Sequence, residues 1–327
     1  MSRSSWRSVR LAAGVAVLGA VLWRTGTGPF VGGLRSLDLW TLALGAALAV
    51  PATVACAWRW HLVAKGLGVG VDMGPAVASY YRAQFLNTTL PGGILGDVHR
   101  GVRHGRDAGD AGRGLRAVVW ERLAGQVVQA AIAIVVLLLL PSPVRSSVPA
   151  MLGVLAAGFV AAALVVRHVP PTGPTSSVPR MLRAVRDDVR CSLLVRRAWP
   201  GVVLASTVAV AFHLSTYLVA ARAVGVTTSP LTLLPVALLV LLAAGLPLNI
   251  AGWGPREGMA AWSFGAAGLG ADQGVATAVA YGAMVLVANL PGAVVLVVAS
   301  GRRGDVRSVE PSPSGQPRVA EGGRAHG

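Results

Sequence analysis

The chain has 327 residues, of which 54% are hydrophobic and only 13% charged, a balance far from that of a soluble domain. Its formal net charge is +16, and nearly all of the positive charge is arginine. The arginines lie between long apolar runs without any nucleic-acid-binding motif, so the positive-inside rule accounts for them and a nucleic-acid partner is excluded. Cys56 and Cys191 are predicted in a span and a cytoplasmic loop, which argues against a disulfide and against a metal site.

Seven apolar runs are candidate membrane spans. A helix needs about 20 apolar residues to cross the hydrocarbon core, so the first and sixth runs are marginal. The arginine-rich N-terminus resembles a signal peptide, but Arg24 follows and no small-residue cleavage site is present, so we predict an uncleaved first span. The runs are Leu11–Trp23, Leu39–Trp58, Val118–Leu140, Val148–Val166, Gly201–Ala221, Leu231–Leu246 and Val275–Val298.

Loop charge predicts a re-entrant hairpin in the first half of the chain. The loop with Arg59 and Lys65 and the loop of residues 100–116 are both basic, so both are predicted to be cytoplasmic. The stretch Pro75–Gly96 between them must then enter and leave the membrane by the same face. Non-helical backbone at that depth is tolerated only inside protein or beside a water-filled cavity. The stretch is apolar but is interrupted by Asn87, Pro91, Gly92, Gly93 and Gly96.

The second half gives the opposite arrangement. Residues 167–197 hold seven arginines against two aspartates and are predicted to be cytoplasmic, as is the basic C-terminus. The stretch Leu231–Gly274 therefore begins and ends outside, with the broken segment Pro247–Gly258 where the chain turns back. The end of the chain is polar and rich in Pro, Gly and Ser, which predicts a membrane domain over 1–300 and a disordered cytoplasmic tail over 301–327.

The two interrupted segments resemble each other. Leu90 to Arg100 and Leu246 to Arg256 share Leu, Pro, Ile, Gly and Arg at the same spacing. Paired broken segments that enter from opposite faces indicate an inverted repeat with a substrate site between its halves. Free N–H groups at a helix break attract anions, and an arginine beside the break adds donors suited to phosphate oxygens. The alternative is that both segments are ordinary turns at the ends of spans.

Polar side chains also occur within the apolar runs. Arg122, Gln126 and Gln129 share one helical face, which should look into the bundle or a cavity rather than into lipid. Glu121 either contacts a substrate or only neutralises a nearby arginine, and the sequence supports both interpretations equally. For His213 and Tyr217, neighbours at i and i+4 in another span, an interhelical hydrogen bond is a simpler explanation than a proton relay.

The same positions resemble a known family. The similarity rests on Phe85-Leu86-Asn87, Leu90-Pro91-Gly92-Gly93, Gly96-Asp97 with Arg100, Glu121-Arg122, Leu246-Pro247, and Gly252-x-Gly254-x-Arg256-Glu257-Gly258. Together these motifs resemble the lysylphosphatidylglycerol synthase transmembrane region, the flippase-like domain of the multiple peptide resistance factor proteins, from about Leu11 to Val298. The resemblance implies movement of an aminoacylated or otherwise modified lipid between leaflets. In full-length synthases a soluble C-terminal domain transfers lysine from lysyl-tRNA, and we do not expect that reaction here because only a short polar tail follows Val298.

We therefore predict an all-α polytopic protein of the bacterial plasma membrane, with about seven to eight transmembrane helices, two re-entrant or broken segments and a possible inverted repeat. Both termini are predicted to be cytoplasmic. The predicted function is movement of a phospholipid or lipid-linked headgroup between leaflets, with anionic or phosphate-bearing membrane lipids as partners. The alternatives are a membrane-embedded transferase and an accessory subunit of a separate synthase. We expect no cofactor, no metal ion and no catalytic residue.

The predicted site has three groups of residues. Those expected to bind the headgroup phosphate are Arg82, Arg100, Arg122 and Arg256. Those expected to support or orient them are Asp97, Glu121, Glu257, Asn87 and Asn249. Those expected to break the helices are Pro91, Gly92, Gly93, Gly96, Pro247, Gly252 and Gly254. A transferase would need a carboxylate pair, and the sequence offers only Asp97 with Glu257.

Overall fold

The structure is a computed structural model, and it describes residues 19–90, 93–140, 198–245 and 253–298. Over these ranges the chain folds into helices joined by turns, which confirms the all-α prediction. The predicted span Val148–Val166, most of the span Leu11–Trp23 and the predicted tail 301–327 lie outside the described residues.

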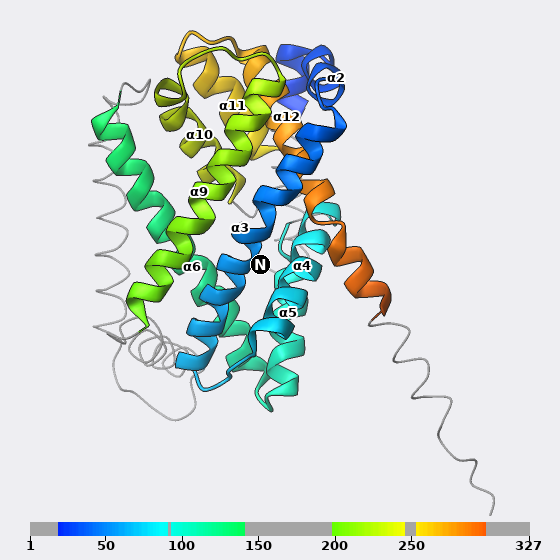
Figure 1. Cartoon of the computed structure of the whole chain (residues 1–327), viewed down its shortest axis with the longest axis vertical. Coiled ribbons are helices and arrows are strands. Elements are labelled where there is room, and N and C mark those ends of the chain that lie inside the picture. Colours follow the sequence, from blue (N-terminus) through cyan, green and yellow to red (C-terminus); the bar gives the residue numbers. More distant parts are fainter. Residues whose placement is uncertain (1–18, 91–92, 141–197, 246–252, 299–327) are drawn as a thin grey trace, which may run out of the picture.

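Four of the described helices are long and apolar enough to cross a membrane. α3 and α9 pack against each other along much of their length, and α6 and α12 flank this central pair (Figure 1). Within each helix the backbone polar groups bond to one another, as a hydrocarbon environment requires. The four are α3 (Leu39–Gly66), α6 (Ala111–Leu139), α9 (Trp199–Ala223) and the helix Ala271–Val298, of which α12 (Ala271–Ala288) is the first part.

The long helices extend beyond the apolar runs that predicted them. α3 continues past Trp58 to Gly66, so Arg59 and Lys65 lie within the helix and not in a loop. The loop prediction was wrong because a hydropathy pattern stops at the first charge, whereas a helix continues wherever its charges find partners or reach the interface. Arg59 is buried at 6% exposure, and Lys65 is exposed near the helix end.

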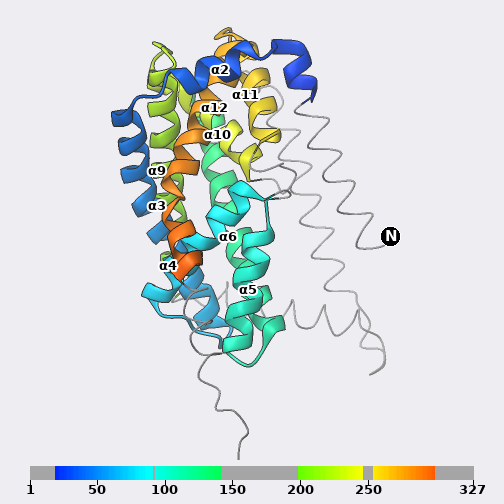
Figure 2. The ribbon, with the colours of Figure 1, turned by 90° about the vertical axis from the view of Figure 1, so that its right-hand side faces the viewer.

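Two short helices form a hairpin between α3 and α6. α4 (Met73–Thr89) and α5 (Leu95–Asp107) meet near mid-height of the long helices, and their other ends lie where α3 ends and α6 begins (Figure 2). His104 on α5 fixes that end, because its Nε2 lies 2.6 Å from the carbonyl oxygen of Val69, just after α3. Gly93 has a φ of 60° beside the hairpin turn. The predicted breakers Pro91 and Gly92 lie outside the described residues.

A second pair of short helices lies near the opposite end of the bundle. α10 (Pro230–Ala244) and α11 (Pro255–Ala266) lie near α2 (Gly28–Arg35) and the start of α12 (Figure 1). Gly254 precedes α11 with a φ of 128°, a conformation that only glycine adopts readily. Pro247, Asn249 and Gly252 lie outside the described residues.

The two halves repeat the same order of elements. α3, α4, α5 and α6 run long, short, short, long, and α9, α10, α11 and α12 do the same. The two pairs of short helices lie at opposite ends of the bundle (Figure 2). The two halves thus share one order of elements but place their short helices at opposite ends.

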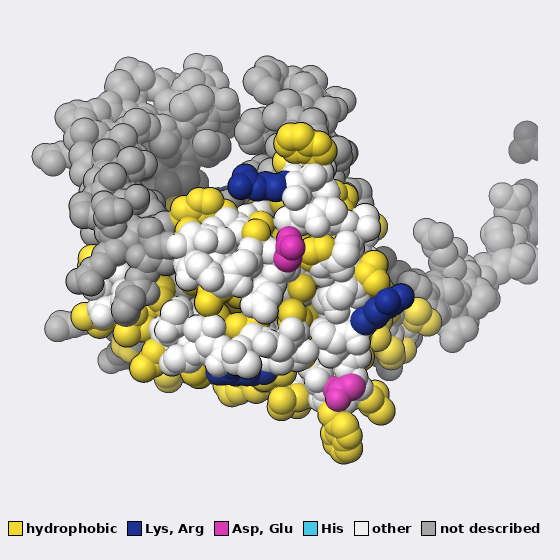
Figure 3. Space-filling model, turned by 90° about the horizontal axis from the view of Figure 1, so that it is seen from above, with side chains coloured by type: hydrophobic (Ala, Val, Ile, Leu, Met, Phe, Trp, Pro, Cys, Tyr) yellow, Lys and Arg dark blue, Asp and Glu magenta, His cyan; other side chains and the backbone are white. Residues whose placement is uncertain are grey.

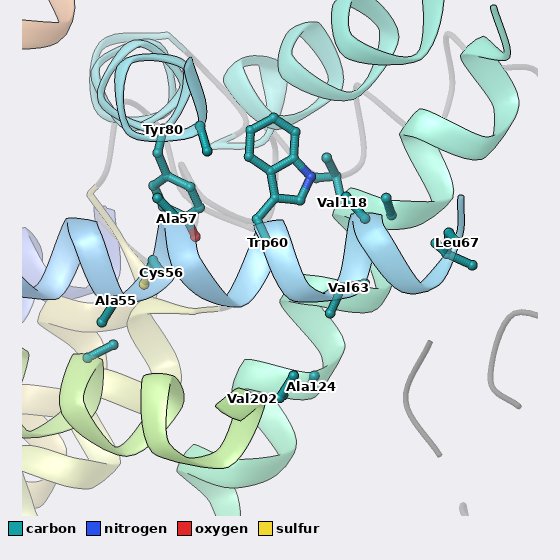
Figure 4. Close-up of a cluster of buried hydrophobic side chains, with 14 of the residues drawn as sticks. Ala55, Cys56, Ala57, Trp60, Val63, Leu67, Tyr80, Val118, Ala124 and Val202 are labelled. Carbon is teal, nitrogen blue, oxygen red and sulfur yellow. The ribbon is translucent and has the colours of Figure 1, made fainter. Parts of the chain in front are cut away.

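Buried apolar side chains form one large cluster in each half. In the first, Trp60 on α3 and Tyr80 on α4 extend into the space between their helices (Figure 4). In the second, Tyr217, Phe264 and Tyr281 pack together from α9, α11 and α12. Each cluster therefore carries large aromatic side chains beside its hairpin.

Gly96 provides a test of the α4–α5 packing. A methyl group added at Gly96 would lie 2.0 Å from the carbonyl oxygen of Ala83, whereas one added at Gly74 would meet nothing within 4 Å. Overpacking costs about 1–3 kcal/mol, so Gly96→Ala is expected to lower the melting temperature of the purified protein in detergent. Gly74→Ala is the matched control and should melt at or above the wild-type temperature. Equal melting of the two variants would contradict the close contact between α4 and α5.

Candidate functional site

The inner end of the first hairpin contributes to a network of three arginines and two carboxylates. Arg59 comes from α3, Asp97 and Arg100 from α5, and Glu121 and Arg122 from α6. Three guanidinium groups against two carboxylates leave this network with a formal charge of +1. Four of the five side chains are at least 88% buried, and that of Arg122 is 42% exposed.

Glu121 lies at the centre of the network and is fully buried. Its Oε1 accepts from Arg59 Nε at 2.9 Å and from the Tyr80 hydroxyl at 3.2 Å. Its Oε2 accepts from Arg100 Nη2 at 3.0 Å. A carboxylate removed from water in this way is tolerated only because both of its oxygens are paired. Glu121 therefore ties three helices to α6.

Asp97 links the hairpin to Arg122. It accepts from Arg100 Nη2 at 3.0 Å, and its Oδ2 lies 2.8 Å from Arg122 Nη2. Asn87 donates to the same carboxylate at 3.0 Å and accepts the backbone N–H of Gly96 at 2.8 Å. Asn87 thus holds the end of α4 against the start of α5.

The network has guanidinium donors that no group within the described residues uses. Arg100 is held between the rings of Trp60 and Tyr80, at 4.5 and 4.3 Å from their centroids. Within the described structure, its Nε and Nη1 have no hydrogen-bond partner, and neither has Nε of Arg122. Arg122 is also the most exposed member of the network. An anion that reached Arg122 would find an excess positive charge and donors that are not yet paired.

A second, smaller group of charged side chains lies at the start of α11. We call the network around Glu121 the first cluster and this group the second cluster. Arg256 Nε donates to Glu257 Oε1 at 2.8 Å, and Glu257 Oε2 accepts the backbone N–H of Gly254 at 2.7 Å. The guanidinium carbon of Arg256 lies 5.5 Å from the ring centroid of Trp253 and 5.6 Å from that of Tyr281. One arginine and one carboxylate leave this pair formally neutral. Arg256 therefore belongs to a separate cluster and not to the ion pairs around Asp97.

The other residues singled out from the sequence have varied surroundings. Arg82 is buried on α4, where its Nη2 lies 3.4 Å from Ser79 Oγ. His213 on α9 and Tyr281 on α12 are joined through Nδ1 and the hydroxyl at 3.2 Å, which confirms the predicted interhelical hydrogen bond for His213. The hydroxyl of Tyr217, for which the same bond was predicted, has no hydrogen-bond partner within the described structure. The candidates outside the described residues are Pro91, Gly92, Pro247, Asn249 and Gly252.

Sequence reasoning missed one member of the charged network and the two aromatic side chains that contact Arg100. Arg59 was assigned to a loop, and Trp60 and Tyr80 were not connected with the arginines. One signal that was available is Gly125 on α6, because a methyl group there would lie 2.6 Å from Arg59 Nη1. A small residue on the buried face of a spanning helix often marks the place where a bulky side chain from another helix packs.

Fold and site together define a multi-pass helical membrane protein with ion-paired arginines at the inner end of a helical hairpin. The sequence model of the family described as Lysylphosphatidylglycerol synthase TM region matches residues 8–292, most of the chain. The chain belongs to this family, which confirms the predicted resemblance. No curated protein and no solved structure matches the chain.

The buried network makes a prediction about stability. Glu121→Gln leaves Arg59 and Arg100 facing a neutral amide, and breaking a buried ion pair costs about 3–5 kcal/mol. The double variant Arg59→Met/Glu121→Gln restores the network charge to +1. Its cost is therefore expected to be clearly smaller than the sum of the two single costs, as measured by denaturant unfolding in detergent. Strictly additive costs would contradict the coupling.

The control for that experiment is the surface pair Arg113–Asp110. Its side chains are 46% and 43% exposed, and Asp110 also accepts the backbone N–H of Arg113 at the start of α6. That hydrogen bond lowers the pKa of the Asp110 carboxyl. Arg113→Gln leaves the backbone hydrogen bond in place and removes only an exposed ion pair. It is expected to cost less than about 1 kcal/mol.

Proposed function

We propose that this protein moves an anionic lipid headgroup between membrane leaflets, with the headgroup phosphate bound by Arg100 and Arg122. The observation that carries the proposal is the +1 charge of the first cluster together with its unpaired guanidinium donors. A phosphate fits both features, because its oxygens accept from the planar guanidinium fork and its charge balances the site. The family to which the chain belongs supports a role in lipid metabolism.

The proposed orientation places the outer end of the first hairpin in the cytoplasm. The basic side chains near that end are Lys65, Arg103, Arg106, Arg113 and Arg116. The opposite end carries few and scattered charged side chains (Figure 3). Excess Lys and Arg on one side marks the cytoplasmic side. The first hairpin would then enter the bilayer from the cytoplasm and the second from outside, within a set of seven to eight spans.

A polar stripe on α6 provides a route away from the first cluster. Arg122, Gln126 and Gln129 follow helical spacing along one face. A methyl group on Gly245 would meet the Gln126 amide, so the end of α10 lies directly against this stripe. In the proposed cycle the headgroup passes from Arg122 along the stripe toward the second pair of short helices, while the acyl chains remain in lipid.

The structure does not favour the transferase alternative. That reaction would need Asp97 and Glu257 in one site. Asp97 is instead paired with arginines of the first cluster, and Glu257 with Arg256 in the second. Each carboxylate is therefore paired with arginine in its own cluster, and the two do not form a carboxylate pair at one acceptor site.

Arg122 is the residue that tests the proposed function. Arg122→Gln reduces the network charge to zero and removes the guanidinium donors of the most exposed member of the network. Hydrogen bonds to charged groups contribute about 1.5–3 kcal/mol, so transport of fluorescent phosphatidylglycerol in proteoliposomes should slow by about tenfold or more. Arg113→Gln removes the same charge from the surface and should transport at the wild-type rate. An unchanged rate in a folded Arg122→Gln protein would contradict the proposal.

The orientation has an independent test. In a background with Cys56 and Cys191 replaced by Ala, a cysteine is introduced at Ala108, between α5 and α6, or at Thr227, between α9 and α10. A membrane-impermeant maleimide should label position 227 in intact cells, and position 108 only after permeabilisation. Labelling of position 108 from outside would overturn the proposed orientation of the first hairpin.

A further inference from the structure

The outer face of α5 carries a groove that the proposed site does not use. The opposite face of the helix is buried and holds Asp97 and Arg100. The outer face opens into a groove of about 380 Å³. Its lining residues are Leu95, Val98, His99, Val102, Arg103, Arg106 and Asp107.

The groove changes from apolar to basic along the helix. Leu95 and Val98, near the inner end of the hairpin, are 39% and 41% exposed, although both are apolar. Arg103 and Arg106 line the other end, beside the single carboxylate of Asp107. At 1.5 Å per residue, Arg103 and Arg106 lie about 8 and about 12 Å along the helix from Val98. In a phospholipid the acyl chains and the phosphate are likewise at opposite ends of the molecule, so the apolar end of the groove matches the chains and the basic end matches the phosphate.

We propose that this groove docks an anionic phospholipid of the cytoplasmic leaflet, with its phosphate at Arg103 and Arg106 and an acyl chain along Leu95 and Val98. The orientation rests on the proposed function. The charge of the rim selects the occupant, because two arginines against Asp107 attract an anionic headgroup. The basic cytoplasmic segment 167–197, with seven arginines and two aspartates, would be repelled by the same rim.

The position of the groove gives it a role before translocation. It runs along the outside of α5 toward the inner end of the hairpin, and the arginine cluster lies on the inside of the same helix. A lipid docked there has its headgroup at the cytoplasmic surface and its chains at the depth of Leu95. Local enrichment of anionic lipid beside the hairpin raises the concentration available to Arg122 and Arg100.

Site-specific photocrosslinking identifies the occupant. The full chain carries p-benzoylphenylalanine at Val98 or, as a control, at Val127, an exposed apolar position on α6. The protein is reconstituted with equal amounts of phosphatidylglycerol and phosphatidylcholine, irradiated, and analysed by mass spectrometry. Phosphatidylglycerol should exceed phosphatidylcholine by about tenfold among adducts at position 98, since each surface arginine contributes about 1 kcal/mol. At position 127 the two lipids should be nearly equal.

Charge removal completes the test. Arg103→Ala/Arg106→Ala should abolish the preference for phosphatidylglycerol at position 98, and Arg113→Ala/Arg116→Ala should preserve it. Equal labelling by both lipids in the parent protein, or adducts to this chain or to a second copy, would overturn the docking groove. If the preference is found but no lipid is transported, the groove stands and the proposed function fails. If transport proceeds without the preference, the groove fails and the proposed function stands.

Discussion

The arrangement of the first half depends on the cost of burying charge. Glu121 is fully buried, and it can stay ionised only because Arg59 and Arg100 donate to its two oxygens. These ion pairs connect α3, α5 and α6, so the position of the hairpin and the chemistry of the site have one physical origin. The same pairs do not balance the charge fully, because a third arginine, Arg122, joins through Asp97. The ion pairs that connect these helices thus leave one net positive charge, which the proposed function assigns to the lipid phosphate.

The repeated order of elements in the two halves gives this site a counterpart that differs in charge. The first cluster is formally +1, whereas the Arg256–Glu257 pair in the second is formally neutral. Both arginines that follow a helix break, Arg100 and Arg256, lie against aromatic rings. On the proposed function, a headgroup phosphate would find an excess positive charge at the first cluster and none at the second.

Much of the fold and part of the site were predictable from the sequence. The apolar runs located the long helices, and the shared Leu-Pro-x-x-Ile-x-Gly-x-x-x-Arg spacing identified Arg100 and the region around Arg256 as special positions. Arg59 was missed because hydropathy treats a charge as the end of a span and cannot show a partner 62 residues away on another helix. The stacking of Trp60 and Tyr80 on Arg100 is equally non-local, since it depends on how three helices pack. Only the three-dimensional structure shows that Arg100 and Arg256 belong to two separate clusters, because the similarity of two sequence motifs does not show whether they meet in space.

The central claim is that a lipid phosphate binds the guanidinium groups of the first cluster. Solid-state NMR can measure this directly, as dipolar dephasing between ³¹P of anionic lipid and ¹⁵N of arginine side chains in the reconstituted full chain. The account predicts dephasing for a phosphate within about 4 Å of the guanidinium nitrogens, as charge-assisted hydrogen bonds require, and its loss in Arg122→Gln. Absence of that contact in the wild-type protein, or the same dephasing in Arg122→Gln, would contradict it.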